Sequence, residues 1–274
     1  MTLVSIGPVT NDLIISGENK QSKTGGACYF QSFVFEEFFN DYLIITNCGD
    51  DELINDFPNS DKVELIKKAD THYFINEYPD VSNRDVRIQS TNFANIPITK
   101  NDLEDILPEN IDAFILNPLN RYDFPKETVE YLAGFNVPIF MSIQGFLRVP
   151  GDEVNGNHTI KLEDFDDLYV ILSDVDVIFM DESEKTILRN NIDVDEVVIT
   201  NGSHGSRVVC KDDEYKINAV RSDDILDSTG CGDTYMAAYI SKKLTTNSIL
   251  KSANFASKIA SDKLGFSGPY KSDI

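Results

Sequence analysis

The sequence predicts an α/β protein with three layers, in which helices cover both faces of a mostly parallel central sheet. Short apolar runs rich in β-branched residues recur along the 274 residues, and helical patterns such as 126–132 separate them. Each run is apolar over nearly its whole length, which is typical of parallel strands covered on both faces. The predicted strands are 3–6, 43–46, 113–116, 138–141, 177–180 and 197–200.

We expect a single domain over residues 1–274, because hydrophobic runs occur throughout and no linker or low-complexity stretch divides the chain. Two segments, about 12–22 and 71–92, do not follow this succession of apolar runs and helices. Their polar and apolar residues alternate instead. We interpret them as extended strands outside the main sheet that form a small β lid. Ordinary surface hairpins would give the same pattern.

The acidic composition argues against a nucleic acid or a membrane surface as a partner. The 46 acidic and 24 basic side chains leave a net charge of −22, whose field repels polyanions. Every apolar run is far shorter than the about 20 residues that a transmembrane helix needs. The four cysteines are scattered without metal-ligand spacing, and the N-terminus does not resemble a signal peptide. These features predict a cytoplasmic protein.

The most informative stretch is a glycine-rich turn at 227–233, Asp-Ser-Thr-Gly-Cys-Gly-Asp, which precedes a helical run. Gly230 and Gly232 allow the backbone to approach a ligand closely, and the N–H groups of the first helical turn favour a phosphate. A carboxylate beside a phosphate is costly unless it transfers a proton or caps the helix. For Asp233, the residues alone leave both roles open.

This turn resembles the Asp-Thr-Thr-Gly-Ala-Gly-Asp signature of the ribokinase-like (PfkB) carbohydrate kinase family. The resemblance implies that Asp233 is the catalytic base and that Gly230, Cys231 and Gly232 supply backbone N–H groups to the transferring phosphoryl group. Cys231 stands where the family usually has alanine, and we expect it to pack as a small apolar residue. The implied reaction transfers a phosphoryl group from ATP, with Mg²⁺, to a substrate hydroxyl.

Two N-terminal motifs extend the resemblance to the substrate side. The segment 7–12, Gly-Pro-Val-Thr-Asn-Asp, is similar to the first strand of the family and implies that Asp12 holds substrate hydroxyls. Gly25 and Gly26 precede a helix expected at 27–39 and resemble the di-glycine signature of the family, although a simple helix entry would also use them. The asparagine that the family often has a few residues later is missing.

A third motif lies in the middle of the chain. Residues 144–148, Gln-Gly-Phe-Leu-Arg, resemble a variant found in one branch of these kinases, although Ser142 stands where an aspartate usually precedes it. The resemblance implies that Gln144 belongs to the substrate site and that Arg148 contacts phosphate, for which a planar guanidinium is suited. Outside this motif, Arg148 would be read as a solvated loop charge.

Three further segments resemble the metal and nucleotide sites of the family. The sequence from Asp181 to Glu184 is similar to an Asn-x-x-Glu motif, which implies that Glu184, with Asp181, organises Mg²⁺. As an alternative, two carboxylates at the start of a helix would stabilise the helix through its dipole. The loop 200–205 is similar to a Thr-x-Gly-x-x-Gly loop that lines the nucleotide, and the helix around 253–257 matches the region that walls the adenine. The implied nucleotide-binding residues are Thr200, Gly202, Gly205, Asn254 and Ser257.

The interpretation of the lid has two consequences. Its strands carry Asn76, Arg84 and Arg87, which are expected to close over the substrate and to exclude water, a competing phosphoryl acceptor. Weak ATP hydrolysis without substrate is therefore predicted. Because exposed strand edges pair readily, homodimerisation through the lid is left open.

The resemblance leaves the substrate open among sugars, polyols and nucleosides. A nucleoside kinase would be distinguished by an aromatic side chain, such as Tyr29, Phe30 or Phe74, that stacks on a base. A function of another class is that of a kinase-derived binding or regulatory protein with weak catalysis. The departures from the family pattern at Ser142, at Asp181 and after the di-glycine pair motivate this alternative, and the intact Asp233 argues against it.

Overall fold

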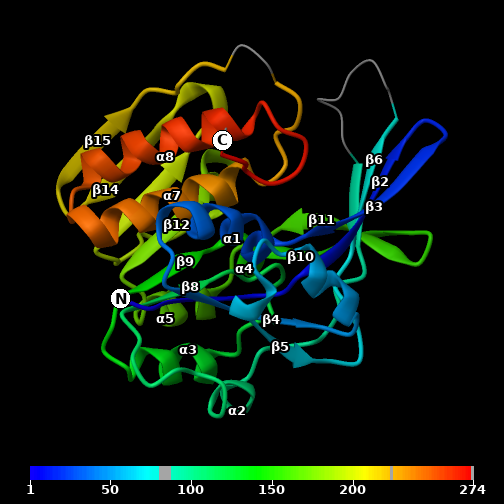
Figure 1. Cartoon of the computed structure of the whole chain (residues 1–274), viewed down its shortest axis with the longest axis horizontal. Coiled ribbons are helices and arrows are strands. Elements are labelled where there is room, and N and C mark those ends of the chain that lie inside the picture. Colours follow the sequence, from blue (N-terminus) through cyan, green and yellow to red (C-terminus); the bar gives the residue numbers. More distant parts are fainter. Residues whose placement is uncertain (80–87, 223–224, 273–274) are drawn as a thin grey trace.

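The computed structural model describes residues 1–79, 88–222 and 225–272, which form two sheets with flanking helices (Figure 1). In this part of the chain the larger sheet has nine strands in the order β15-β14-β13-β12-β9-β8-β1-β4-β5. Neighbouring strands are parallel from β13 to β5, whereas β14 and β15 add an antiparallel edge. The strands are β1 (Leu3–Ile6), β4 (Tyr42–Cys48), β5 (Val63–Lys67), β8 (Ala113–Leu116), β9 (Ile139–Ser142), β12 (Val177–Asp181), β13 (Glu196–Thr200), β14 (Ser206–Cys210) and β15 (Asp213–Ile217).

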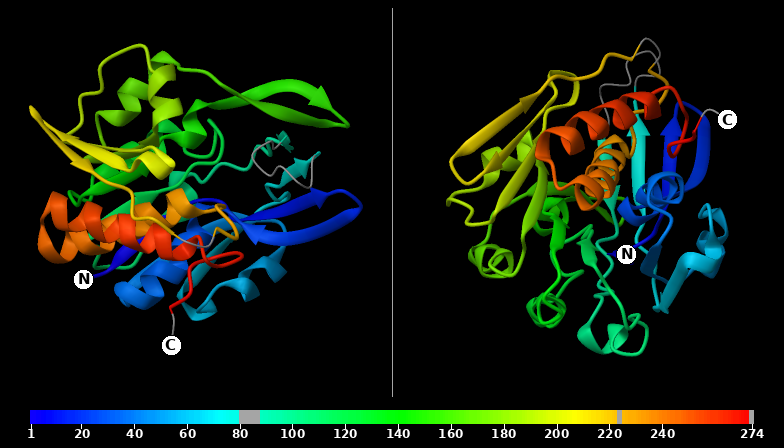
Figure 2. Two further views of the ribbon diagram at one scale, coloured as in Figure 1. Left: turned by 90° about the horizontal axis from the view of Figure 1, so that it is seen from above. Right: turned by 60° about the vertical axis from the view of Figure 1, so that its left-hand side comes forward.

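Helices cover both faces of this sheet, as the continuous apolar runs predicted (Figures 1 and 2). The strand β1 shows why: Leu3 faces a core shared with α1, α7 and α8, while Val4 and Ile6 face a second core shared with α2, α3 and α5. The helices are α1 (Ala27–Phe38), α2 (Lys100–Leu103), α3 (Lys126–Ala133), α4 (Gln144–Leu147), α5 (Asp166–Leu172), α6 (Glu182–Ile187), α7 (Cys231–Thr246) and α8 (Ile249–Lys263), with 3₁₀ turns η1 (Asp51–Asp56), η2 (Ser60–Lys62) and η3 (Gly202–His204).

A second sheet of six described strands, in the order β10-β11-β7-β6-β2-β3, projects beside the main sheet and is called the lid sheet below (Figure 2). The segments predicted as strands outside the main sheet, 12–22 and 71–92, contribute four of these strands, and a hairpin of β10 and β11 adds two. The strands are β2 (Thr10–Ser16), β3 (Asn19–Gly25), β6 (Phe74–Tyr78), β7 (Ile88–Thr91), β10 (Arg148–Val154) and β11 (Asn157–Leu162). The predicted lid residues Arg84 and Arg87 lie outside the described residues.

The hairpin of β10 and β11 was not predicted from the sequence. Its strands are mostly polar, but a turn signal is present, because Asn155 and Gly156 have φ values of 53° and 81°. An Asn-Gly pair with two positive φ angles is typical of a tight β-hairpin turn. This hairpin matters for the site because its first residue is Arg148. Among the described residues, no helix is both long and apolar enough to span a bilayer.

Candidate active site

A cleft of about 510 Å³ lies between the lid sheet and the N-terminal end of α7. It brings together residues from distant parts of the chain, because β2, α1, α4 and α7 all contribute to its walls. The parallel strands of the main sheet end toward this side, where open α/β sheets bind their ligands. The sequence-predicted residues that line the cleft are Asp12, Gly26, Gln144, Arg148, Gly230, Cys231, Gly232 and Asp233.

The signature turn enters α7 through a residue that only glycine suits. Gly230 has a φ of 75°, and a Cβ atom there would lie 2.2 Å from the ring of Phe30. The N–H of Cys231 donates to the carbonyl oxygen of Ser228 at 3.2 Å. In the described backbone, no carbonyl accepts the N–H groups of Gly232 and Asp233, which belong to the first turn of α7. These two N–H groups are therefore available to an anion.

Asp233 is a half-buried carboxylate whose pKa is raised to about 6, mainly because burial disfavours its charged form. The positive charges of Arg148 and Lys263 partly offset this effect. Among the described residues, no side chain makes a capping hydrogen bond at the start of α7, so the capping role considered for Asp233 finds no support. A carboxylate with this pKa is ionised at neutral pH and is close to the range that suits a general base.

Arg148 is positioned by the start of β10, immediately after the short helix α4. Its guanidinium carbon lies 5.5 Å from the centroid of the Phe74 ring of the lid sheet, a cation–π contact. Its charge also lowers the pKa of both Asp233 and Glu184. The residue thus lies near both the predicted catalytic base and the predicted metal-binding carboxylate and lines the cleft, which a solvated loop charge would not do.

Asp181 and Glu184 form a capping box at the start of α6. The Asp181 side chain accepts the N–H of Glu184 at 2.8 Å, and the Glu184 side chain accepts the N–H of Asp181 at 2.8 Å. Helix-start stabilisation, the alternative left open by the sequence, is therefore observed. Glu184 is only 4% exposed, and burial and the charge of Asp181 raise its pKa, while a hydrogen bond with Gln144 lowers it.

A dedicated metal cage is not seen, since the described residues contain no cluster of three or more His, Cys, Asp and Glu side chains that would hold a metal ion. One buried carboxylate that faces Arg148 and Gln144 does fit a Mg²⁺ ion held mainly by phosphate oxygens and water, which is the usual pattern for this ion. The two N–H groups at the start of α7 likewise fit a phosphate group.

The substrate side of the cleft is built by the pairing of β2 with β3. Thr10 pairs with Gly25, and a Cβ atom at Gly25 would lie 2.5 Å from Oδ2 of Asp12 and 2.6 Å from Oγ1 of Thr10. The glycine therefore makes room for two side chains of the cleft rather than for a substrate. The Oγ1 atom of Thr10 is buried and has no hydrogen-bond partner within the described structure. Thr10 is a polar cleft residue that the sequence did not predict.

Asn76 lines an adjoining cavity of about 310 Å³ that shares Asp12 and Tyr78 with the cleft. It is 6% exposed, and its Oδ1 accepts a hydrogen bond of 2.8 Å from Gln89 of the neighbouring strand β7. Because Asn76 and Gln89 are paired across the lid sheet, they present their side chains on one face. The sequence analysis did not predict Tyr78 or Gln89 as cleft residues. Tyr78 could have been found, because side chains two positions apart on a strand point to the same face and Asn76 was already a candidate.

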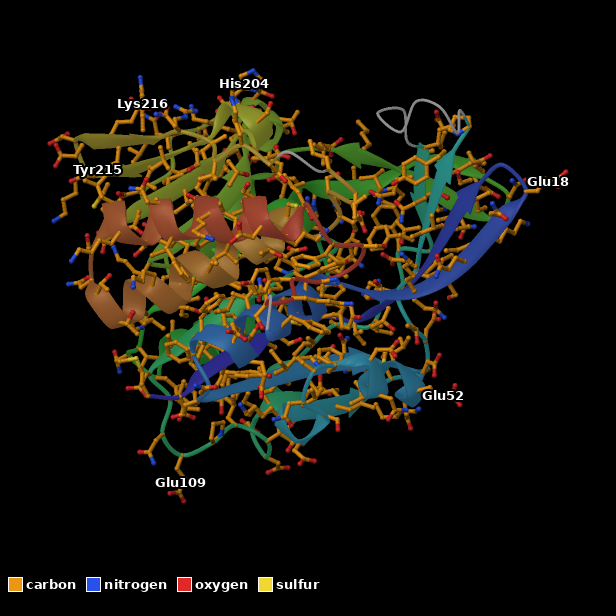
Figure 3. The ribbon with its side chains drawn as sticks, turned by 45° about the horizontal axis from the view of Figure 1, so that its top comes forward. Glu18, Glu52, Glu109, His204, Tyr215 and Lys216 are labelled. Carbon is orange, nitrogen blue, oxygen red and sulfur yellow. The ribbon has the colours of Figure 1, made fainter. Side chains whose placement is uncertain are left out.

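The predicted nucleotide-binding residues lie apart from the cleft, in the β13–β14 turn and on α8. Ser257 donates to the carbonyl oxygen of Asn218 at 3.2 Å, and the exposed Asn254 donates to Leu250 of its own helix at 2.7 Å. Thr200 Oγ1 donates to the carbonyl oxygen of Met180 at 3.4 Å. Gly202 and Gly205 flank His204, which Figure 3 shows at the surface with its side chain pointing outward.

Cys231 behaves as the sequence predicted for a small packed residue. Its Sγ contacts the carbonyl oxygen of Ala260 on α8 at 3.8 Å, and burial raises the pKa of the thiol to about 11. The thiol is therefore neutral at physiological pH and is a poor nucleophile. The backbone N–H of Cys231 is bonded to the carbonyl oxygen of Ser228, so in this conformation it is not available to phosphate either. All four cysteines, Cys28, Cys48, Cys210 and Cys231, are free.

This arrangement of a doubly covered parallel sheet, a separate lid sheet and a glycine-rich turn opening a late helix is the ribokinase fold. A solved pyrophosphate-dependent kinase of the ribokinase family, in complex with a pyrophosphate analog and myo-inositol, has a TM-score of 0.82 at 22% identity, covering 98% of this chain and 97% of its own. Arabidopsis thaliana ribokinase, in complex with ribose and ATP, has a TM-score of 0.73 at 17% identity, covering 97% and 93%. At these identities the likeness concerns the fold.

The sequence comparisons point to the same class of protein. A family model described as pfkB family carbohydrate kinase matches residues 170–272, which include the signature turn, α7 and α8. The nucleoside kinase of Methanocaldococcus jannaschii is 31% identical over 83 residues, which are 27% of this chain and 28% of that enzyme. The chain thus matches less than a third of the length of this relative. Together, the comparisons confirm the predicted resemblance to ribokinase-like (PfkB) kinases and the predicted fold class.

Proposed function

We propose that the protein is an ATP-dependent PfkB-type kinase that phosphorylates a hydroxyl group of a small carbohydrate or polyol. One observation carries this proposal: Asp12, Arg148, Asp233 and the available N–H groups of the first turn of α7 line a single cleft. The family match over residues 170–272 and the kinase relatives support a phosphotransferase. The intact Asp233 argues against the alternative of a binding or regulatory protein.

In this mechanism Asp233 accepts the proton of the substrate hydroxyl as the oxygen attacks the phosphoryl group. The N–H groups of Gly232 and Asp233 and the guanidinium of Arg148 stabilise the negative charge on the transferring oxygens. Asp12 orients the substrate from β2, and Thr10 is buried beside it. No covalent enzyme intermediate is required, and the residues of the cleft mainly position reactants and neutralise charge.

The metal and nucleotide assignments are part of the same proposal. Glu184, held in place by the capping box with Asp181, is the residue that would hold Mg²⁺, and the ion would neutralise phosphate charge when bound. The turn after β13 and the face of α8 would line the nucleotide. This set comprises Thr200, Gly202, Gly205, Asn254 and Ser257.

Pyrophosphate is a second candidate donor. The solved relative with a TM-score of 0.82 is described as pyrophosphate-dependent, and the side chain of Asn254 is bonded to its own helix in this structure. A pyrophosphate donor needs the anion-binding turn but no adenine wall. A nucleoside is likewise the alternative acceptor, because Phe30 and Phe74 line the cleft and offer aromatic surfaces for a base.

We also propose a cytoplasmic location, supported by the four free cysteines, and homodimerisation through the lid sheet. On the face opposite the cleft, the lid sheet borders a cavity of about 540 Å³ whose lining includes Leu13, Tyr73 and Ile75. Apolar side chains on this face of the lid sheet, together with its edge strand β3, are suited to a second copy of the chain. Sedimentation at several protein concentrations would test this association.

The decisive experiment is a screen of sugars, polyols and nucleosides with Mg·ATP or Mg·pyrophosphate, with wild type beside Asp233→Asn. Turnover by wild type alone would support the kinase and identify both donor and acceptor. Equal turnover by both proteins would remove Asp233 from the role of base. Nucleotide binding without turnover by either protein across the panel would favour the regulatory alternative.

A further inference from the structure

A lysine is completely buried beneath the signature turn. Lys263, at the C-terminal end of α8, is 0% exposed, and its Nζ donates a hydrogen bond of 2.7 Å to the backbone carbonyl oxygen of Asp227, the first residue of the turn. Lysine is almost never fully buried unless its charge is paired, because an ammonium ion loses strong hydration. The position of this charge therefore calls for a physical reason.

The contacts around Lys263 tie the signature turn to the end of α8. The N–H of Leu226 donates to the carbonyl oxygen of Leu264 at 2.8 Å, next to the lysine. The side chain of Asp227 accepts the N–H groups of Thr229 at 2.9 Å and Gly268 at 3.1 Å. Asp227 is thus held at both its carbonyl and its carboxylate, and Lys263 is the cation of this set, close to the negative charge of Asp227.

The charge of Lys263 also reaches the reacting end of the turn. It lowers the pKa of Asp233 and of Asp227, while burial lowers the pKa of the ammonium group itself. The positive charge of Lys23 also lowers the pKa of Lys263, in the same direction as burial. The cleft above would receive several negative charges when a phosphate chain binds near Asp233. A buried cation close to such a site is stabilised by the ligand and stabilises it in return.

We propose that Lys263 is a positioning residue of the anion site: its ammonium group holds the signature turn in the phosphate-binding conformation through the carbonyl of Asp227. Its positive charge also lies near Asp233 and adds to the attraction of the signature turn for phosphate. This inference rests on the proposed function in one respect, that the anion is the transferring phosphate. The lysine itself need not touch the substrate.

The first test compares Lys263→Met with Lys258→Met. Methionine keeps most of the length of the lysine stem without its charge, and Lys258 is a matched control on the same helix, with a side chain 63% exposed and paired with Asp262. The measurement is the affinity for inorganic tripolyphosphate by titration calorimetry. We expect Lys263→Met to weaken binding by about 10–100-fold, as for the loss of a charged contact, and Lys258→Met to leave it unchanged. An unchanged affinity in folded Lys263→Met would overturn the proposal.

Two further variants separate the charge from the fold. Lys263→Gln keeps a donor for the Asp227 carbonyl but no charge, and intermediate tripolyphosphate affinity is expected. Lys263→Ala leaves space for a small cation, so methylammonium chloride is expected to restore binding, while tetramethylammonium chloride at the same ionic strength is not. If Lys263→Met does not fold, these two variants carry the test. Affinity equal to wild type in either variant, without added cation, would contradict the assigned role.

Binding and turnover together distinguish the two proposals. If wild type binds tripolyphosphate in a Lys263-dependent way but phosphorylates no compound of the panel, the kinase proposal fails and the role of Lys263 stands. If wild type is an active kinase and Lys263→Met keeps both its kcat and its tripolyphosphate affinity, the role of Lys263 fails and the kinase stands. A loss of kcat with an unchanged unfolding temperature would support both.

Discussion

The guanidinium of Arg148 and the carboxylate of Asp233 line one cleft, and the positive charge of Arg148 lowers the pKa of Asp233. Burial raises the pKa of Asp233 to about 6, and Arg148 provides the largest opposing effect. Because Arg148 begins the first strand of the β10–β11 hairpin, the position of the lid sheet contributes to the basicity of the proposed catalytic residue. Arg148 therefore connects the lid sheet with the proposed catalytic residue.

The pH dependence of the reaction follows from this pKa. A general base works in its ionised form, so we expect kcat/KM of wild type to rise about tenfold per pH unit below pH 6 and to level off above about pH 7. The measurement is a pH profile from 4.5 to 9 with the acceptor identified in the screen. A profile that is flat from pH 5 to 8 would argue against Asp233 as the base.

Removing the charge of Arg148 has two expected effects. Arg148→Met should lower kcat by about 10²-fold, because one charge-stabilising group is lost, and should shift the acidic limb of the pH profile upward, because nothing then opposes burial as strongly. The control is Arg189→Met, which removes a guanidinium from a side chain that is 61% exposed. A lower kcat with an unmoved acidic limb would leave Arg148 as a phosphate contact alone.

Asp233→Asn is expected to stabilise the protein while it abolishes turnover. A pKa raised from 3.8 to about 6 means that the folded protein binds the proton more tightly than the unfolded chain, so stability falls as pH rises from about 4 to 6. Asparagine avoids that loss. The free energy of unfolding of the variant should exceed that of wild type by up to about 3 kcal/mol at pH 8, and the two should be nearly equal at pH 4. Urea unfolding at the two pH values measures the difference; an equal gain at both would assign it to another cause.

Gly25→Ala should damage the substrate side of the cleft. Its Cβ atom would displace the side chains of Asp12 and Thr10, from which it would lie 2.5 and 2.6 Å. We expect KM for the acceptor to rise at least about tenfold, kcat to change less, and stability to fall by about 1–3 kcal/mol. Gly265→Ala is the control, because its Cβ would make only an ordinary contact of 3.5 Å with Asp262. An unaltered KM in Gly25→Ala would show that Asp12 does not hold the acceptor.

Six of the nine described strands of the main sheet were predictable from the sequence, because they are apolar over nearly their whole length. The predicted runs 3–6 and 113–116 coincide with β1 and β8, and the other four agree with observed strands within one or two residues. The strands β5, β14 and β15 were not predicted, because polar residues interrupt their apolar pattern. The β10–β11 hairpin was not predicted, because its strands are largely polar and because β11 pairs with β7, which is distant in sequence. Local periodicity carries no information about such a pairing.

The candidate site was predictable only where a residue pattern is local. The signature turn at 227–233 and Gln144 to Arg148 were found because their spacing is short, and the cleft brings both together. Thr10 and Gln89 were not found, because their place in the cleft depends on how the lid sheet is oriented. The role of Lys263 was not predicted for a similar reason, because only the tertiary packing shows that its ammonium group is buried beneath the turn.

The capping box at α6 allows a last test that separates helix stabilisation from metal binding. Glu184→Gln keeps an oxygen that accepts the Asp181 N–H but removes the charge from a side chain that is 4% exposed. Because burial disfavours that charge, stability at neutral pH should stay equal or rise. If Glu184 organises Mg²⁺, the metal concentration for half-maximal turnover should increase about tenfold or more. Asp181→Asn, which keeps a capping oxygen for the Glu184 N–H, should change this concentration much less. Equal metal dependence in wild type and Glu184→Gln would leave the pair as a helix cap.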